Sequence, residues 1–318
     1  MYERIASNKR KTWALIFGFV LIVGLIGWAF GQYLGYGFIG LAVALGIAIL
    51  MTWGSYFNSD KIALAMSHAK PADDTKYQQL NNIVESLSIA AGIPKPRVYV
   101  VEDSAPNAFA TGRNPEHAAI AVTTGLLEKL NRDELEGVIA HELSHVKNRD
   151  ILIMTIAVTL VGVIILLADI FIRALWWGGG RGGNRNSGGG AGAILAIFGL
   201  VLLVLGPLIG KIMQFAISRR REYLADADGV FLTRYPDGLI SALEKLKADQ
   251  TVVKTGSRAT AHLWIETPIP TSAADARQGK GRGAWLNRMF ETHPPLDDRI
   301  AVLKESALAG SMPPEAPT

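Results

Sequence analysis

The chain contains no cysteine and only six histidines among its 318 residues. Without cysteine it can form no disulfide bond, and no metal site can use a thiolate ligand. Any zinc site must therefore be built from histidine, aspartate and glutamate side chains. Charge is also scarce, since charged residues make up 19% of the chain and apolar residues 49%. This composition leaves room for a soluble core, but the apolar residues are unevenly spread.

The apolar residues are concentrated in four runs that carry almost no charge. Each run is near the length of about 20 residues that a helix needs to cross a bilayer. The runs cover residues 13–30, 34–53, 151–177 and 191–217. Residues 1–53 are therefore predicted to hold a short tail and a membrane hairpin, and residues 151–217 a second membrane pair with a glycine-rich loop at 178–190. A cleaved signal peptide is the alternative for the first run, but the second run follows at once and no cleavage site is visible.

Basic residues at the ends of these runs predict the orientation in the membrane. Four of them precede the first run: Arg4, Lys9, Arg10 and Lys11. By the positive-inside rule the N-terminus is cytoplasmic, and four crossings return both polar segments, 54–150 and 218–318, to that side. If the first run did not set the orientation of the chain in the membrane, the topology could be inverted. The two polar segments would still lie on one side. The clustering of basic residues at membrane ends argues against nucleic acid as a partner.

The first polar segment ends close to the pattern HExxH, formed by His141, Glu142 and His145. Residues at i and i+4 lie on one face of a helix, so both imidazoles can reach one zinc ion. Glu142 can hold a zinc-bound water and take its proton, which is the chemistry of peptide-bond hydrolysis. Residues 131–135 supply a helix cap, and apolar residues recur at helical spacing beside the ligands, which predicts that the motif lies on a helix.

A catalytic zinc usually takes three protein ligands and leaves one position for water. The third ligand must lie on the same side of the membrane as HExxH. Glu222 and Asp226 share a helix face directly after the fourth run, just as HExxH precedes the third. One of them can bind zinc while the other accepts a hydrogen bond from a ligand histidine. Such a site would also take cobalt or manganese, although these ligands favour zinc.

The order and spacing of these features resemble the HtpX-type membrane zinc endopeptidases, which are relatives of the CAAX prenyl endopeptidases. The resemblance covers nearly the whole chain and is also carried by residues 107–112, 222–226 and 292–299. It implies a mainly α-helical membrane protein with four transmembrane helices. Residues 54–150 and 218–318 would combine into one cytoplasmic, zincin-like α+β metalloprotease domain with a small sheet.

The resemblance also implies roles for individual residues. Glu222 would be the third ligand of one Zn²⁺ per chain, and Glu142 would be the general base. Asp226 would support the metal site by accepting a hydrogen bond from a ligand histidine. Three further residues would lie near the metal, where they could hold the substrate backbone or stabilise an oxyanion: Asn107, His293 and Arg299.

The expected activity is zinc-dependent hydrolysis of peptide bonds. By resemblance, the substrates would be misfolded or damaged membrane proteins and unfolded polypeptides, cleaved on the cytoplasmic side of the bacterial inner membrane during a stress response. The lipid bilayer would be a constant partner. Two alternatives stay open, namely endopeptidase processing of prenylated C-termini and a non-catalytic membrane scaffold.

Residues 118–122 form a short strand-like run before the HExxH helix. If this strand lies at the edge of a sheet, it could align a peptide beside the zinc by strand addition, which reads backbone rather than sequence. The alternative is an internal strand next to residues 98–101. The sequence favours neither position.

Overall fold

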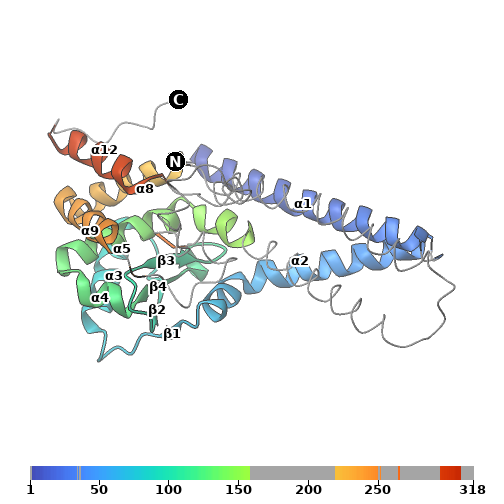
Figure 1. The fold of residues 1–318 in the computed structure, drawn as a ribbon, viewed down its shortest axis with the longest axis horizontal. Coiled ribbons are helices and arrows are strands. Elements are labelled where there is room, and N and C mark those ends of the chain that lie inside the picture. The colour runs from blue at the N-terminus through green and yellow to red at the C-terminus, as the bar shows by residue number, and fades with distance from the viewer. Residues whose placement is uncertain are drawn as a thin grey trace.

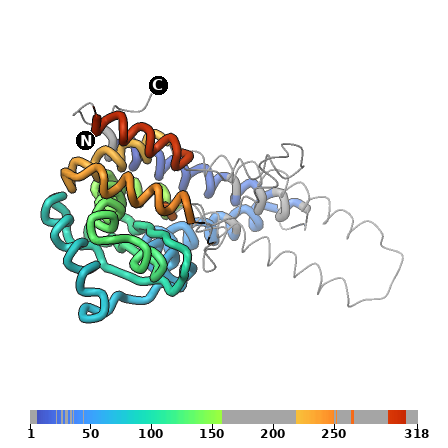
Figure 2. The backbone as a smooth tube through the Cα atoms, turned by 60° about the vertical axis from the view of Figure 1, so that its left-hand side comes forward, coloured from blue at the N-terminus to red at the C-terminus, as the bar shows by residue number. Residues whose placement is uncertain are grey.

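The computed structural model describes residues 2–33, 35, 37–157, 219–249, 251, 264–265 and 294–308. Helices dominate this part of the chain, which also contains one small mixed sheet. Two long helices, α1 (Tyr2–Tyr33) and α2 (Phe38–Met66), lie side by side in opposite directions (Figure 1). The sheet and the other labelled helices gather at one end of this hairpin, as Figure 2 also shows.

The hairpin exposes large apolar side chains along both of its helices. In α1 they include Trp13, Phe17 and Leu21, whose exposed fractions are 66, 71 and 50%. Within the described residues, α2 is the one helix found to be long and apolar enough to cross a membrane. The predicted run 13–30 lies within α1, and most of 151–217 lies outside the described residues. The four crossings and the cytoplasmic orientation therefore stay predictions.

Helix α2 continues well beyond the end of the second apolar run. It reaches Met66 with a kink at Asn58, whose φ of −116° and ψ of 16° are not helical. The Asn58 side chain donates to the Gly54 carbonyl oxygen (2.9 Å) across this kink. The last turns of α2 pack into a buried cluster beneath the sheet through Ala63 and Leu64. The hairpin is thus joined to the rest of the protein through the buried last turns of α2.

The sheet has the strand order β1-β2-β4-β3. Its strands are β1 (Lys70–Pro71), β2 (Arg97–Val101), β3 (Ala108–Thr111) and β4 (Ala119–Thr123). Strand β4 pairs in parallel with β2 and antiparallel with β3, and all of its residues are buried. The internal position is therefore confirmed for the run 118–122, and the edge position is wrong. In the described part of the chain β3 ends the sheet, and there Ile265 N donates to the Ala108 carbonyl oxygen (3.0 Å).

Alternate residues of β4 enter two separate cores, as the pleat of a strand requires. Ile120 and Val122 belong to a cluster shared with α3 (Gln78–Ala91), α5 (Arg132–Lys147) and α9 (Pro236–Ala248). Ala119 and Ala121 belong to a cluster that includes Leu15 of α1. The short helices η1 (Pro115–His117) and α4 (Thr124–Lys129) lie at the two ends of β4.

The C-terminal helices complete the fold around α5. They are α8 (Arg219–Thr233), α9 and α12 (Leu296–Leu308). Both α8 and α9 pack against α5, and α12 packs against α8 and α9. Helix α5, which carries HExxH, is therefore covered by segments from the far end of the chain (Figure 1).

Candidate metal centre

Helix α5 begins with an N-terminal cap formed by Asn131. Asn131 Oδ1 accepts a hydrogen bond from Glu134 N (3.0 Å), and Glu134 Oε2 accepts one from Asn131 N (2.8 Å), which together form a capping box. The Glu134 carboxylate also accepts hydrogen bonds from Ser241 and Lys245 of α9 (2.6 and 2.7 Å). The cap and the α9 contacts position α5, and the predicted helix over the motif is confirmed.

Three side chains converge at one point between α5 and α8. They are His141, His145 and Glu222, which are nearly fully buried and whose ligand atoms lie within 4.8 Å of one another. The two histidine Nε2 atoms are 3.2 Å apart, and each lies 3.6 to 3.7 Å from a Glu222 carboxylate oxygen. Ligand atoms about 2.0–2.1 Å from a tetrahedral zinc would be separated by roughly 3.3 Å. The three residues therefore fit a zinc ion.

The outer nitrogen of each imidazole contacts a carboxylate. His141 Nδ1 lies 2.9 Å from Asp226 Oδ1, and His145 Nδ1 lies 3.3 Å from Asp150 Oδ2. A carboxylate at Nδ1 holds the proton on that nitrogen and leaves the Nε2 lone pair for a metal. Both histidines are thus in the orientation that a metal site requires.

Arg299 of α12 holds the first of these carboxylates in place. It is fully buried and donates from Nε and Nη2 to the two oxygens of Asp226 (2.8 and 2.6 Å). Its Nη1 lies 3.7 Å from Glu222 Oε2. Burial alone would raise the pKa of Asp226, but Arg299 and His141 hold it below its usual value. This two-point contact fixes the plane of the carboxylate and, through it, the His141 ring.

Negative charge surrounds the other imidazole. Burial by itself would lower the pKa of His145, but the hydrogen bond with Asp150 and the charges of Glu222, Asp150 and Glu142 raise it to about 9. Glu142 directly follows the ligand His141 on α5, and its charge adds to this shift. It is also buried, with 3% of its surface exposed. A site with this charge balance is suited to a divalent cation.

Most of the residues predicted from the sequence lie in this one cluster: His141, Glu142, His145, Glu222, Asp226 and Arg299. Asn107 is buried directly before β3, where its N–H donates to Thr123 Oγ1 (2.8 Å). His293 lies outside the described residues. Contact of Asn107, His293 and Arg299 with substrate stays a prediction.

The sequence yields no role for Asp150, although the structure places it against His145. A signal was present, because Asp150 directly precedes the apolar run 151–177. A carboxylate next to a buried or membrane segment needs a partner. Its partners, however, come from other parts of the chain, including Asn8 of α1 (2.7 Å), so sequence spacing could not identify them.

The sequence is similar to those of known peptidases. The model of Peptidase family M48 matches residues 74–307. A "Protease HtpX homolog" of Thermoanaerobacter pseudethanolicus is 47% identical over 304 residues, which cover 96% of this chain and 97% of that protein. Another, from Streptococcus gordonii, is 41% identical over 307 residues, with 96% and 99% covered. The crystal structure of S. mikatae Ste24p aligns with a TM-score of 0.49 at 19% identity, covering 95% of this chain and 67% of that one. The family match and the identities show that the chain belongs to peptidase family M48.

Proposed function

We propose that this protein is a zinc endopeptidase of the bacterial inner membrane. It would cleave misfolded or damaged membrane proteins and unfolded polypeptides on the cytoplasmic side, as part of a stress response. The observation that carries the proposal is the pair of histidine Nε2 atoms 3.2 Å apart beside Glu222, with both Nδ1 atoms held by carboxylates. Two imidazoles and one carboxylate favour zinc.

The residues around the metal centre suit hydrolysis of a peptide bond. A zinc ion at this three-ligand site would supply the Lewis acidity that makes a water molecule acidic near neutral pH. Glu142 would take a proton from the attacking water and deliver it to the leaving amine. Asp226, held by Arg299, would keep the His141 ring in its metal-binding orientation throughout the reaction.

The place of the centre in the fold supports membrane proteins as substrates. Asn8, near the start of α1, donates to Asp150 (2.7 Å), which in turn contacts the ligand His145. The exposed apolar surface of α1 begins at Trp13, about 7.5 Å further along the helix axis at 1.5 Å per residue. The catalytic centre would therefore lie just outside the bilayer, where loops of other membrane proteins would reach it first.

Replacement of Glu142 by Gln tests the proposed reaction. Wild-type protein in detergent, loaded with zinc, should cleave unfolded casein and a loop peptide from a membrane protein. Glu142→Gln should bind zinc equally well but cleave at least about 100-fold more slowly, because the general base is lost. Glu136→Gln is the matched control, since Glu136 lies on the same helix and pairs with Arg132 at the surface (2.9 Å). Cleavage by Glu142→Gln at the wild-type rate would contradict the mechanism.

A prenylated peptide in the same assay separates the two alternatives. Preferential cleavage of that peptide over the unmodified loop would favour the processing of prenylated C-termini. If zinc bound but no peptide were cleaved, a non-catalytic scaffold would be favoured. The geometry of the metal centre favours neither alternative over the proposed endopeptidase.

A further inference from the structure

The chain turns sharply between the HExxH helix and Asp150. Helix α5 ends at Lys147, and Arg149 adopts a left-handed backbone conformation with a φ of 58°. Residues other than glycine rarely adopt this conformation. The helical geometry of α5 therefore does not determine where the Asp150 side chain points, although that side chain contacts the ring of His145 on α5. Contacts from other parts of the chain must hold it there.

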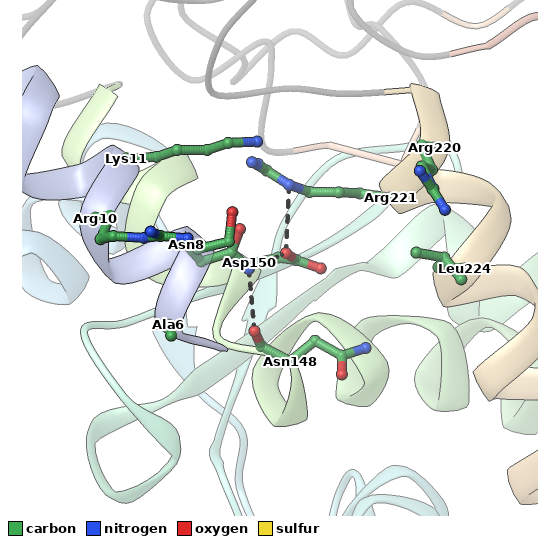
Figure 3. Close-up of a pocket in the computed structure, with 10 residues that line it drawn as sticks. Ala6, Asn8, Arg10, Lys11, Asn148, Asp150, Arg220, Arg221 and Leu224 are labelled. Atoms are coloured by element: carbon green, nitrogen blue, oxygen red, sulfur yellow. Dashed lines mark hydrogen bonds and ion pairs between the residues drawn. The ribbon is translucent and has the colours of Figure 1, made fainter. Parts of the chain in front are cut away.

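Asn8, in the second turn of α1, makes such a contact. Its Nδ2 donates to Asp150 Oδ1 (2.7 Å) and to the Asn148 carbonyl oxygen at the end of α5 (3.1 Å). Figure 3 shows Asn8 beside both residues, at the wall of a pocket of about 720 Å³ between α1 and α8. Arg221 Nε of α8 lies further from the same carboxylate oxygen, at 3.5 Å. Because only 5% of Asn8 is exposed, water competes little for its hydrogen bonds.

The two oxygens of Asp150 have different partners. Oδ1 accepts the hydrogen bond from Asn8, and Oδ2 faces His145 Nδ1 (3.3 Å). A hydrogen bond to Oδ1 limits the rotation of the carboxylate and so directs Oδ2 at the imidazole. Arg299 holds Asp226 in a comparable way beside the other ligand histidine. Each ligand is thus oriented through a carboxylate that a residue from a distant part of the chain holds.

We propose that Asn8 is a positioning residue of the metal centre. It directs the Asp150 carboxylate at His145, so that metal affinity depends on the docking of the first turns of α1. Asn8 would touch neither the metal nor the substrate. This role rests on the zinc site of the proposed function, but it requires no particular substrate. It also couples the membrane hairpin to the metal centre, because by thermodynamic linkage a metal that fixes His145 stabilises the docked position of α1.

The experiment is a double-mutant cycle on zinc affinity, measured by competition with a chromophoric chelator on the full-length protein in detergent. Asn8→Leu removes the amide at similar volume and should weaken zinc binding about tenfold, as expected for a group that helps to orient a metal ligand. Asp150→Asn should weaken it at least as much. In the double variant, the Asn8 change should add less than about twofold to the effect of Asp150→Asn, because Asn8 acts through that carboxylate.

Thr12→Val is the matched control. Thr12 is 2% exposed and lies one turn further along α1, where its Oγ1 donates to the Asn8 carbonyl oxygen (2.9 Å). The variant loses a buried hydrogen bond of the same helix but no contact of Asp150. It should bind zinc as the wild type does, even if the metal-free protein unfolds at a lower temperature. The absorption spectrum of bound Co²⁺, which reports ligand geometry, should change in Asn8→Leu but not in Thr12→Val. Asn8→Ala gives the same comparison if Asn8→Leu does not fold.

Three results would show that Asn8 does not position the ligand: equal zinc affinity in Asn8→Leu and the wild type, an equal loss in Thr12→Val, or additive losses in the double variant. These results would leave the proposed zinc endopeptidase intact. If the wild type bound zinc but cleaved no peptide, the proposed function would fail, while the zinc measurements alone would still decide the role of Asn8. A wild type that bound no zinc would overturn both.

Discussion

At the scale of single residues, the metal centre depends on side chains that would not themselves touch the metal. Asp226 and Asp150 each contact the Nδ1 atom of one ligand histidine. Arg299 in turn binds both oxygens of Asp226. These groups determine which imidazole nitrogen carries the proton, and so whether His141 and His145 can bind a metal at all.

Replacement of Asp226 by Asn should lower zinc affinity about 10–100-fold, because an amide holds the Nδ1 proton of His141 less strongly than a carboxylate does. Competition with a chromophoric chelator measures this affinity. Asp228→Asn is the matched control, since Asp228 lies on the same helix but accepts a hydrogen bond from Asn148 (2.8 Å). If the two variants bound zinc equally well, Asp226 would not orient the ligand.

At the scale of elements, α5 is positioned by close contact with two helices from the C-terminal part of the chain. Glu134 joins the start of α5 to α9. A Cβ at Gly137 would lie 2.7 Å from Leu239 N of α9, and a Cβ at Gly229 of α8 would lie 3.0 Å from His141 N. The two glycines therefore permit helix distances that place the ligands together.

The contact at Glu134 predicts a pH dependence of stability. Burial would raise the pKa of Glu134, but hydrogen bonds from Lys245 and Ser241 lower it below the unfolded value of 4.5. The stabilisation is therefore present above pH 4.5 and is lost as the pH falls through the folded value. Glu134→Gln should have a lower free energy of unfolding than the wild type near pH 7, and the difference should shrink under acid conditions. Chemical denaturation at several pH values measures it, and a difference independent of pH would refute this linkage.

Replacement of Gly137 by Ala tests the close approach of α5 and α9. Alanine would favour an exposed helix by about 1 kcal/mol, but here its methyl group meets the backbone of α9. We expect a net loss of about 1–3 kcal/mol in the free energy of unfolding. Gly54→Ala is the control, because nothing lies within 4 Å of a Cβ at that position. If Gly137→Ala were more stable than the wild type, α5 and α9 could move apart without a loss in the free energy of unfolding.

At the scale of the whole molecule, the metal centre joins two parts of the chain that are far apart in sequence. His141 and His145 precede the segment 158–218, and Glu222 follows it. A metal that binds all three ligands stabilises the folded state in which these parts meet.

Removal of the metal should therefore destabilise the protein. Chelation should lower the thermal unfolding midpoint of the detergent-solubilised wild type, and added zinc should restore it. Glu222→Gln should show a smaller shift with zinc, because only the two histidines of α5 would remain as strong ligands. Lys247→Gln, a surface change elsewhere in the C-terminal half, is the control and should respond to zinc as the wild type does. An equal zinc response in wild type and Glu222→Gln would contradict the three-ligand site.

Much of the catalytic cluster could be predicted from local sequence pattern. The spacing of His141 and His145 requires only a helix, and the capping residues Asn131 and Glu134 indicate where that helix begins. Glu222 and Asp226 were recognisable as a pair because they share a helix face after an apolar run, and the resemblance to a known family then separated their roles. These features depend on residues close together in the chain, where helical geometry alone places the side chains.

Other features required the tertiary structure, because they join residues that are distant in sequence. The internal position of β4 depends on its pairing with both β2 and β3, and the same apolar run could have formed an edge strand. The role of Asp150 depends on Asn8, His145 and Arg221, which arrive from three separate helices. Local helical spacing in the amino-acid sequence thus determined the two histidine ligands and the general base, and the family resemblance supplied Glu222 as the third ligand. Only the packing of distant helices decided that Asp150 contacts His145 and that Arg299 holds Asp226, because these contacts join residues far apart in the chain.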